Sequence, residues 1–229
     1  MSNIEALLIV VKRLESVRKR VVFVGGSVRE LLITDDAAPP ERPTDDVDGI
    51  VSISSRGEYY RFADELRGLG FHEDTSEGAP MCRWLVAGVR VDVMPDRASI
   101  LNFTNRWYTD ALAHAMEATV QGETFKIISA PYFCATKLEA FSNRGKGDFY
   151  HHDLEDIIAV ADGRQELLAE VKAASTDVCE YIASEVTGLL ASPGFMEALP
   201  GHLPGDSASQ ARLPIVKERL EALTRPRRE

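Results

Sequence analysis

The sequence predicts an α/β (α+β) protein, with a mixed sheet flanked by helices in its first part and a helical region in its second. Short runs rich in β-branched residues recur up to about residue 130, and helix-like runs separate them. Long helical patterns dominate from residue 132 to residue 190. We therefore expect two domains, an α/β domain over residues 1–130 and a helical domain over residues 131–229.

The first domain is expected to begin with an amphipathic helix from Ile4 to Arg20, because its apolar residues recur at spacings of three and four. Strands are predicted at Val21–Val24, Val47–Ile53, Met81–Val86, Val89–Met94 and Thr124–Ser129, and helices at Ser27–Leu32, Gly57–Leu69 and Trp107–Glu117. Ala87-Gly88 predicts a tight hairpin between two of these strands. The stretch from Thr34 to Pro43 holds three prolines and little apolar bulk, which indicates a loop.

The second domain is expected to consist of helices between Tyr132 and Leu190, interrupted near Gly145, Gly147 and Gly163. Residues 192–209 are rich in glycine, proline and serine. A short charged helix from about Pro214 to Leu223 is predicted to close the chain.

Composition excludes several classes of protein. The chain is 45% hydrophobic and 27% charged, and its formal charge of −10 gives no general attraction for a phosphate backbone, so any contact with nucleic acid would need a local basic cluster. The three cysteines are widely spaced and form no CxxC pair, which argues against a disulfide framework or a zinc site. The apolar run Ala6–Val11 is too short to span a bilayer. We expect a cytoplasmic protein without a membrane partner.

The most informative motif is Gly25-Gly26-Ser27 after a predicted strand, followed by Asp46-Val47-Asp48 at the start of the next strand. Aspartates at positions i and i+2 of a strand project from the same face. Two carboxylates held so close repel each other unless a cation lies between them, which is the arrangement that a divalent metal prefers. The glycines remove side chains where a backbone must approach phosphate, and the following helix offers free N–H groups.

Asp92 supplies a third carboxylate. It lies in the middle of an apolar strand, where an unpaired charge is costly to bury, so it should have a partner or a metal. With Asp46 and Asp48 it would complete a cluster for two metal ions. Each motif alone has an ordinary explanation, a turn or a solvated strand end, but their combination in this order favours a functional site.

The segment VVFVGGSVRELL…RPTDDVDGIV resembles the signature of the DNA polymerase beta-type nucleotidyltransferase superfamily. The resemblance implies that Asp46, Asp48 and Asp92 are catalytic and bind two Mg²⁺ ions, for which Mn²⁺ could substitute. It also implies that Asp92 helps to deprotonate the acceptor hydroxyl. The residues expected to bind the NTP are Gly25, Gly26, Ser27 and Arg29. The long gap between the two motifs, filled by the proline-rich loop, departs from the family pattern and leaves the geometry of the phosphate loop open.

The second half resembles, more narrowly, the AbiEii/AbiGii toxin-like nucleotidyltransferases. The resemblance rests on the Lys137-Leu138-Glu139-Ala140-Phe141 segment, on Arg144 and on the Asp153-Leu154-Glu155-Asp156 segment. It implies that Lys137, Arg144 and Asp153 complete the nucleotide or acceptor site, with tRNA or a protein as the acceptor and an antitoxin as a possible partner. Lys146 could extend the phosphate contact, and an N-terminal acid such as Asp153 is also favoured by the helix dipole alone.

Other functions are compatible with parts of the pattern. GGSVRELL followed by DVD also resembles the head domain of CCA-adding and poly(A) polymerases, although the expected Arg-Arg-Asp stretch is missing. The acidic charge would suit a cationic, aminoglycoside-like acceptor. A catalytically inactive nucleotide-binding module is the non-enzyme alternative. His151-His152-Asp153 suggests a metal-hydrolase, but no further histidine lies in a matching motif, and no Gly-Lys-Ser/Thr follows the glycine turn as in a Walker-type NTPase.

Overall fold

The computed structural model of the protein describes residues 1–39, 42–145 and 147–225. The chain forms two compact units, the first comprising Met1–Val28 and Arg42–Ser129 and the second comprising Arg29–Glu41 and Ala130–Glu229. The change of unit at residue 130 coincides with the expected domain boundary, but the segment after the glycine turn also belongs to the second unit. Lys146, and residues 40 and 41 of the predicted loop, lie outside the described residues.

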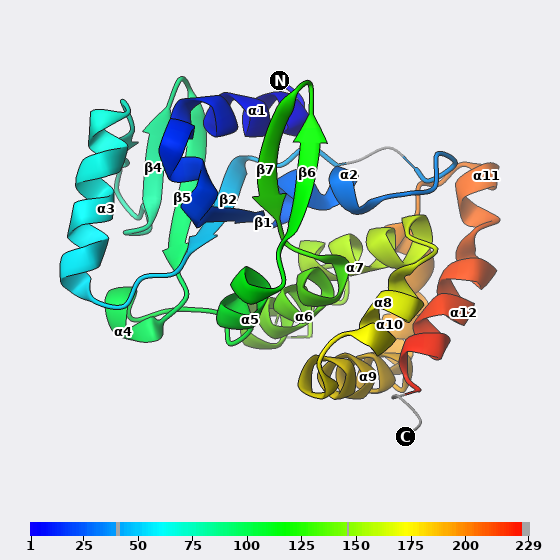
Figure 1. Ribbon diagram of the computed structural model, residues 1–229. Helices are drawn as coiled ribbons and strands as arrows, with labels where there is room; N and C mark the ends of the chain where they lie inside the picture. Colours follow the sequence, from blue (N-terminus) through cyan, green and yellow to red (C-terminus); the bar gives the residue numbers. More distant parts are fainter. Residues whose placement is uncertain (40–41, 146, 226–229) are drawn as a thin grey trace. The chain divides into compact units, whose positions relative to one another are not determined.

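The first unit is built on one mixed sheet, which Figure 1 shows with its covering helices. Its strands have the order β3-β4-β5-β2-β1-β7-β6. Strand β1 pairs antiparallel with β2 and parallel with β7, and β2 pairs parallel with β5; the hairpins β4–β5 and β6–β7 complete it. The strand bounds are Val21–Val24 for β1, Asp46–Val51 for β2, His72–Glu73 for β3, Arg83–Val86 for β4, Val89–Pro95 for β5, Met116–Val120 for β6 and Glu123–Ile127 for β7.

Helix α1 (Asn3–Leu14) contacts β2, β5 and β7 across one face of the sheet (Figure 1). Its first turn is stabilised by a capping box in which the Ser2 and Glu5 side chains each accept the other's backbone N–H. The helix ends at Leu14, six residues before the predicted end. Glu15 has a φ of 47°, which leaves the helical region, and the 3₁₀-helix η1 (Glu15–Arg20) follows.

Helix α3 (Arg56–Gly68) begins where the sequence predicts, with Ser55 as its N-cap. The shorter elements of this unit are η2 (Gly26–Val28), α4 (Ala98–Leu101) and α5 (Tyr108–Ala113). The predicted helix Trp107–Glu117 is wrong in its second part, because α5 ends at Ala113 and Met116 opens β6. Gln121 and Gly122 both have positive φ, which allows the chain to reverse tightly between β6 and β7.

The second unit is helical and is organised around α6 (Ala130–Ala140), whose residues from Ala130 to Leu138 are all buried. Helix α6 contacts α7, α8 and α9, and α12 packs against the same three helices. The bounds are Arg29–Leu32 for α2, His152–Gly163 for α7, Leu167–Ala173 for α8, Thr176–Leu190 for α9, Pro193–Ala198 for α10, Leu199–His202 for the 3₁₀-helix η4, Ser207–Gln210 for α11 and Leu213–Leu223 for α12, and a π-helical turn covers Phe141–Gly145. In the described part of the chain, no helix combines the length and apolar character needed to cross a membrane.

Candidate functional site

The glycine turn follows directly from β1. Gly25 has a φ of 70°, a left-handed conformation that favours glycine, and it turns the chain into η2. Ser27 is fully buried, and its hydroxyl donates a hydrogen bond of 3.4 Å to the carbonyl oxygen of Val24. A phosphate contact by the Ser27 hydroxyl would therefore require the side chain to leave this bond.

The three aspartates lie on two neighbouring strands. Asp46 and Asp48 project from the same face of β2, and Asp48 is the Cα partner of Asp92 in the parallel pair β2–β5. Asp92 is buried, whereas Asp46 and Asp48 are partly exposed. The sheet thus brings together three carboxylates from positions up to 46 residues apart, as their spacing and strand positions predict.

The glycine turn and the carboxylates are in direct contact. Val24, the last residue of β1, is the partner of Asp48 in the antiparallel pair β1–β2, so Gly25 lies beside the Asp48 side chain. A Cβ atom on Gly25 would lie 2.0 Å from Asp48 Oδ2, so the Asp48 side chain or the turn would have to move. Gly25 is therefore required both by its backbone conformation and by the space that the Asp48 carboxylate occupies.

Arg83 on β4 lies among these carboxylates. Its Nε and Nη2 donate to Asp92 Oδ1 and Oδ2 at 2.8 and 2.7 Å, a two-point interaction that matches the planar guanidinium to the carboxylate. The same Nη2 donates to Asp46 Oδ2 at 3.2 Å. Arg83 therefore joins carboxylates of both strands, and it is the charged partner that the buried Asp92 requires.

The pKa values in this cluster reflect burial and charge. Burial, followed by the negative charge of Asp92, raises the pKa of Asp46 above its usual range, although Arg83 and Arg90 oppose this shift. Burial raises the pKa of the neighbouring Cys82 thiol to about 12, and the Asp92 charge adds to the effect. Cys82 is therefore a neutral, unreactive thiol at physiological pH.

The position of Arg83 opposite Asp92 could have been predicted from the hairpin in the sequence, although not from the glycine and aspartate motifs. The two-residue turn Ala87-Gly88 fixes the register of the β4–β5 hairpin, in which Val86 pairs with Val89 and Arg83 with Asp92. Counting back from the turn would have placed Arg83 opposite the third carboxylate. The single motif GGS…DVD contains no information about this cation.

The carboxylates have the donor chemistry that Mg²⁺ or Mn²⁺ prefers, because these hard cations bind carboxylate oxygens. Burial, followed by repulsion from Asp92, raises the pKa of Asp46, and a bound cation would oppose both effects. The donor chemistry of these residues therefore suits a divalent ion, although no choice of one oxygen from each of the three aspartates brings all three within 4.8 Å of one another. Arg83 shares its guanidinium between Asp46 and Asp92.

The other predicted residues form a second cluster within the helical unit. Lys137 on α6 pairs with Asp153 Oδ1 at 3.2 Å and with Asp156 Oδ2 at 2.6 Å, both on α7. Arg144 donates to both oxygens of Asp153 at 2.8 Å, and Arg29 donates to Asp156 Oδ1 at 2.8 Å. We call these five residues the α6–α7 ion network. Its two aspartates are almost completely buried.

Asp156 was the member of this network not proposed as a site residue. It follows Asp153 by three positions, so both lie on the same face of α7. With Glu155, which lies 3.6 Å from Arg29, the network holds three cationic and three anionic side chains. Because these charges balance, a phosphate bound by Lys137 would have to compete with two buried carboxylates.

Protonation in this network is governed by the cations. Burial alone would raise the pKa of Asp153, but the hydrogen bonds from Arg144 and the charge of Lys137 outweigh it and lower that pKa.

His151, His152 and Asp153 place potential metal-ligating atoms within 4.8 Å of one another, the one such trio among residues 1–39, 42–145 and 147–225. Lys137 and Arg144 already occupy the Asp153 carboxylate, which disfavours a metal ion there.

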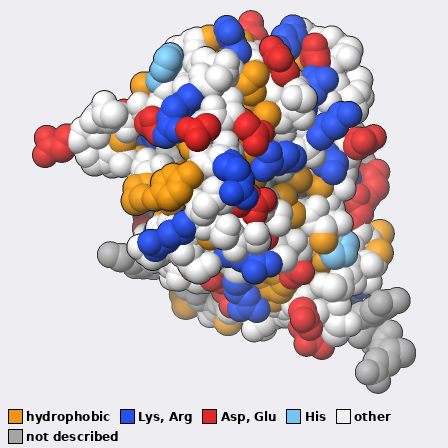
Figure 2. Space-filling model, turned by 60° about the vertical axis from the view of Figure 1, so that its left-hand side comes forward, with side chains coloured by type: hydrophobic (Ala, Val, Ile, Leu, Met, Phe, Trp, Pro, Cys, Tyr) orange, Lys and Arg blue, Asp and Glu red, His pale blue; other side chains and the backbone are white. Residues whose placement is uncertain are grey.

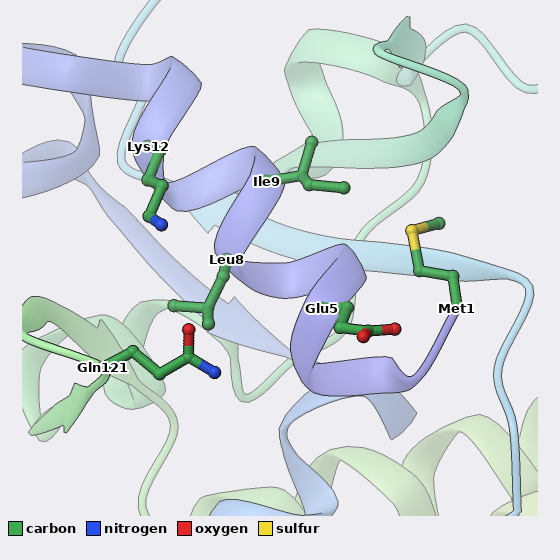
Figure 3. A pocket seen from close by; sticks show the side chains of 6 residues that line it. All are labelled: Met1, Glu5, Leu8, Ile9, Lys12 and Gln121. Carbon is green, nitrogen blue, oxygen red and sulfur yellow. The ribbon is translucent and has the colours of Figure 1, made fainter.

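A shallow pocket of about 370 Å³ lies in the first unit against α1 (Figure 3). Its lining residues are Met1, Glu5, Leu8, Ile9, Lys12 and Gln121. Figure 3 shows Leu8 and Gln121 side by side on one flank, with Met1 and Glu5 on the other. Glu5 Oε2 already accepts the Ser2 N–H at 2.7 Å as part of the capping box. None of the lining residues belongs to the carboxylate cluster.

Comparison with solved structures gives the class of this fold. An antigenic nucleotidyltransferase-like protein from Paracoccidioides brasiliensis is similar to it with a TM-score of 0.56 and 17% sequence identity, over 95% of this chain and 92% of that chain. JHP933 from Helicobacter pylori matches over 96% of this chain and 89% of that chain, with 9% identity and a TM-score of 0.48. No protein-family model and no curated protein sequence matches the chain.

The chain therefore has a nucleotidyltransferase-like fold, with a mixed seven-stranded sheet, covering helices and a C-terminal helical region in the residues that the structure describes. This is the fold class that the sequence predicts. At 17% identity the likeness establishes the fold and leaves the reaction to be argued from the site.

Proposed function

We propose that the protein is a metal-dependent nucleotidyltransferase, which transfers a nucleoside monophosphate from an NTP to an acceptor hydroxyl. One observation carries this proposal: Asp48 and Asp92 are register partners on β2 and β5, with Asp46 on the same face, directly beside a glycine turn that leaves space for the Asp48 carboxylate. A structural role alone does not require three carboxylates at one point of a sheet, because their mutual repulsion is destabilising.

In this reaction the acceptor hydroxyl gives up its proton and its oxygen forms a bond to the α-phosphorus. The bond from the α-phosphorus to the oxygen that bridges to the β-phosphate breaks, and pyrophosphate leaves. Divalent ions would neutralise the charge of the triphosphate and align the reacting oxygens. Asp46 and Asp48 would hold the ions, and Gly25 would keep the turn open beside them. Positioning and charge neutralisation would then supply most of the rate acceleration.

The acceptor that we propose is tRNA or a protein, with the enzyme acting as the toxin of a toxin–antitoxin pair. The support is the similarity of the segments around Lys137 and Asp153 to toxin-like nucleotidyltransferases. Arg144 is the most exposed cation of the α6–α7 ion network, at 56% for its side chain, and is the member most accessible to an incoming phosphate. On the face drawn in Figure 2, acidic and basic side chains intermix, so charge on that face does not select one acceptor class.

The proposal is tested by incubating the purified protein with Mg²⁺ and each α-³²P-labelled NTP, with total tRNA, a protein extract or a panel of aminoglycosides as acceptor. Asp48→Asn and Asp92→Asn are the test variants. Asp45→Asn is the matched control, because Asp45 precedes the motif and its side chain is 88% exposed. We expect transfer by the wild type and by Asp45→Asn, and a loss of at least a hundredfold in the two test variants.

The labelled product identifies the acceptor class and the base. Label on an aminoglycoside alone would replace the tRNA or protein acceptor by a small cationic molecule and leave the transferase in place. If no acceptor is labelled and no NTP binds, the chain is an inactive relative, and the proposal is wrong.

A further inference from the structure

We propose that Arg83 takes the place of one of the two metal ions that the sequence resemblance implies. The wild-type chain would then bind a single divalent cation through Asp46 and Asp48, while the guanidinium serves as a fixed cation on Asp92. This inference rests on the proposed function, because it treats the carboxylate cluster as a metal site. It changes the expected number of ions from two to one.

The contacts of Asp92 are the first argument. Arg83 donates to both of its oxygens, at 2.8 and 2.7 Å, so the carboxylate face that a metal would use is already filled. Both partners are withdrawn from water, with side chains that are 19% and 12% exposed. A two-point, charge-assisted pair of this kind is stronger and more specific in geometry than a single contact, so a weakly held ion would not readily displace it.

The contact with Asp46 differs from the contact with Asp92. Arg83 Nη2 approaches one oxygen, Asp46 Oδ2, at the longer distance of 3.2 Å, and the Asp46 side chain is 31% exposed. Asp48 lies two residues further along the same face of β2. Arg83 therefore holds Asp46 less closely than Asp92, and Asp46 shares its face of β2 with Asp48.

The charges around Asp92 also disfavour a second ion there. Arg83 places one positive charge against Asp92 and shares it with Asp46. Arg90, the other basic residue that influences Asp46, points instead toward Asp45, with an Nη2–Oδ1 distance of 3.6 Å. A second ion beside Asp92 would meet the positive guanidinium at close range, which is unfavourable in a partly buried site.

The position of Arg83 is set by the backbone. Strand β4 pairs with β3 on one side and with β5 on the other, and the Ala87-Gly88 turn fixes which residue faces Asp92. Moving Arg83 away would require either a new side-chain rotamer without its carboxylate partner or a shift of the hairpin register. The guanidinium is thus a built-in part of the cluster.

The test is a titration of the full chain with Mn²⁺ in the absence of nucleotide, with free Mn²⁺ measured by electron paramagnetic resonance. We expect one ion per chain for the wild type and two for Arg83→Gln, because the substitution releases the Asp92 carboxylate. Arg90→Gln is the matched control. It removes a positive charge from β5, next to the strand of Arg83, but leaves the Arg83–Asp92 pair in place, and this variant should bind one ion.

Two further variants keep the test decisive if Arg83→Gln does not fold. Asp92→Asn should still bind one ion, because Asp92 is not a ligand in the wild type. Arg83→Lys keeps the charge but cannot hold both oxygens, and should bind a second ion at least tenfold more weakly than the first.

The possible failures of the two proposals differ. Two ions on the wild type, or a loss of the single ion in Asp92→Asn, would overturn the role of Arg83 and leave the transferase proposal intact. Absence of Mn²⁺ binding in every variant, together with absence of nucleotide transfer, would overturn both.

Discussion

Gly25 combines two requirements at a single residue. Its φ of 70° disfavours any side chain, and its Cα faces the Asp48 carboxylate so closely that a Cβ has no space. The sequence predicts a glycine turn here because the protein backbone must approach a phosphate group closely. The structure adds a second reason, which is that the missing side chain leaves room for one of the three carboxylates.

Substitution of Gly25 distinguishes the effect of its positive φ from the effect of the space that the Asp48 carboxylate needs. Gly25→Ala should lower the free energy of unfolding by clearly more than Gly78→Ala and should weaken Mn²⁺ binding at least tenfold. Gly78 has a φ of 82° but no atom within 4 Å of an added Cβ, so its substitution costs only the backbone strain, about 1–2 kcal/mol. Urea unfolding and Mn²⁺ titration of both variants provide the measurement. Equal effects of the two would show that Asp48 simply moves aside.

Lys137 is the residue whose surroundings differ most from the sequence-based expectation of a phosphate contact. Its side chain is 11% exposed and bridges Asp153 and Asp156. Removing one partner from a buried ion network leaves uncompensated charges. Lys137→Met should therefore destabilise the protein by about 3–5 kcal/mol in chemical denaturation.

The control for this prediction is Lys217→Met. Lys217 lies on α12, is half exposed and is 3.9 Å from Glu221, so its loss should cost less than about 1 kcal/mol. A Lys137 variant with unchanged stability and no transferase activity would instead assign Lys137 to the substrate.

Among the secondary-structure elements, strand β6 is informative because it was missed. The residues Met116 to Val120 alternate between apolar and polar side chains, but Met116 and Glu117 were assigned to the predicted helix Trp107–Glu117, and neither face of the strand is buried. Strand β3 has two exposed residues and leaves no pattern at all. The buried strands β1, β2 and β5, by contrast, were predicted from β-branched residues, because burial on the sheet selects those side chains.

The 3₁₀-helix η4 and the segment before α7 are connected by His202, whose Nε2 lies 2.7 Å from the carbonyl oxygen of Phe149. Burial lowers the pKa of His202, and the hydrogen bond to Phe149 only partly opposes this shift. The native state therefore disfavours protonation. The contribution to stability is complete above the unfolded pKa of about 6.5 and is lost as pH falls toward the lower folded value.

We expect the free energy of unfolding of the wild type to decrease between pH 7.5 and pH 5.5, and to decrease less steeply in His202→Gln. The difference in slope cannot exceed one proton, or about 1.4 kcal/mol per pH unit. Urea unfolding at several pH values measures both slopes. His152, whose pKa burial also lowers, remains in both proteins and cancels in the comparison. Parallel slopes would contradict a role of His202.

The catalytic role of the three aspartates remains a prediction, whereas for the whole molecule the sequence patterns predicted the fold class. They did not predict the α6–α7 ion network, because Arg29 and Asp156 are 127 residues apart and meet through tertiary packing. They also missed Arg83, since its partner is fixed by hairpin register and not by a local motif. Local patterns identify elements, whereas the pairing of charges depends on how those elements pack.

Metal binding should be visible in the stability of the entire chain. A ligand that binds only the folded state stabilises it by about 2.7 kcal/mol at a concentration of 100 Kd. We expect 10 mM Mg²⁺ to raise the Tm of the wild type and of Asp45→Asn relative to EDTA, and to have no effect on the double variant Asp46→Asn/Asp48→Asn. Calorimetry provides the measurement, and an equal shift in all three proteins would indicate a nonspecific salt effect.

The segment Arg29–Glu41 belongs to the helical unit although residues of the sheet unit precede and follow it along the chain. It is tied to its unit by the Arg29–Asp156 pair and by the amides of Thr34 and Asp35, which both donate to the carbonyl oxygen of Gly163. A gene exchange that joined a foreign C-terminal half at residue 130 would deprive this segment of its partners. The two halves are therefore expected to be inherited as one piece, and to change together in evolution rather than be shuffled as independent modules.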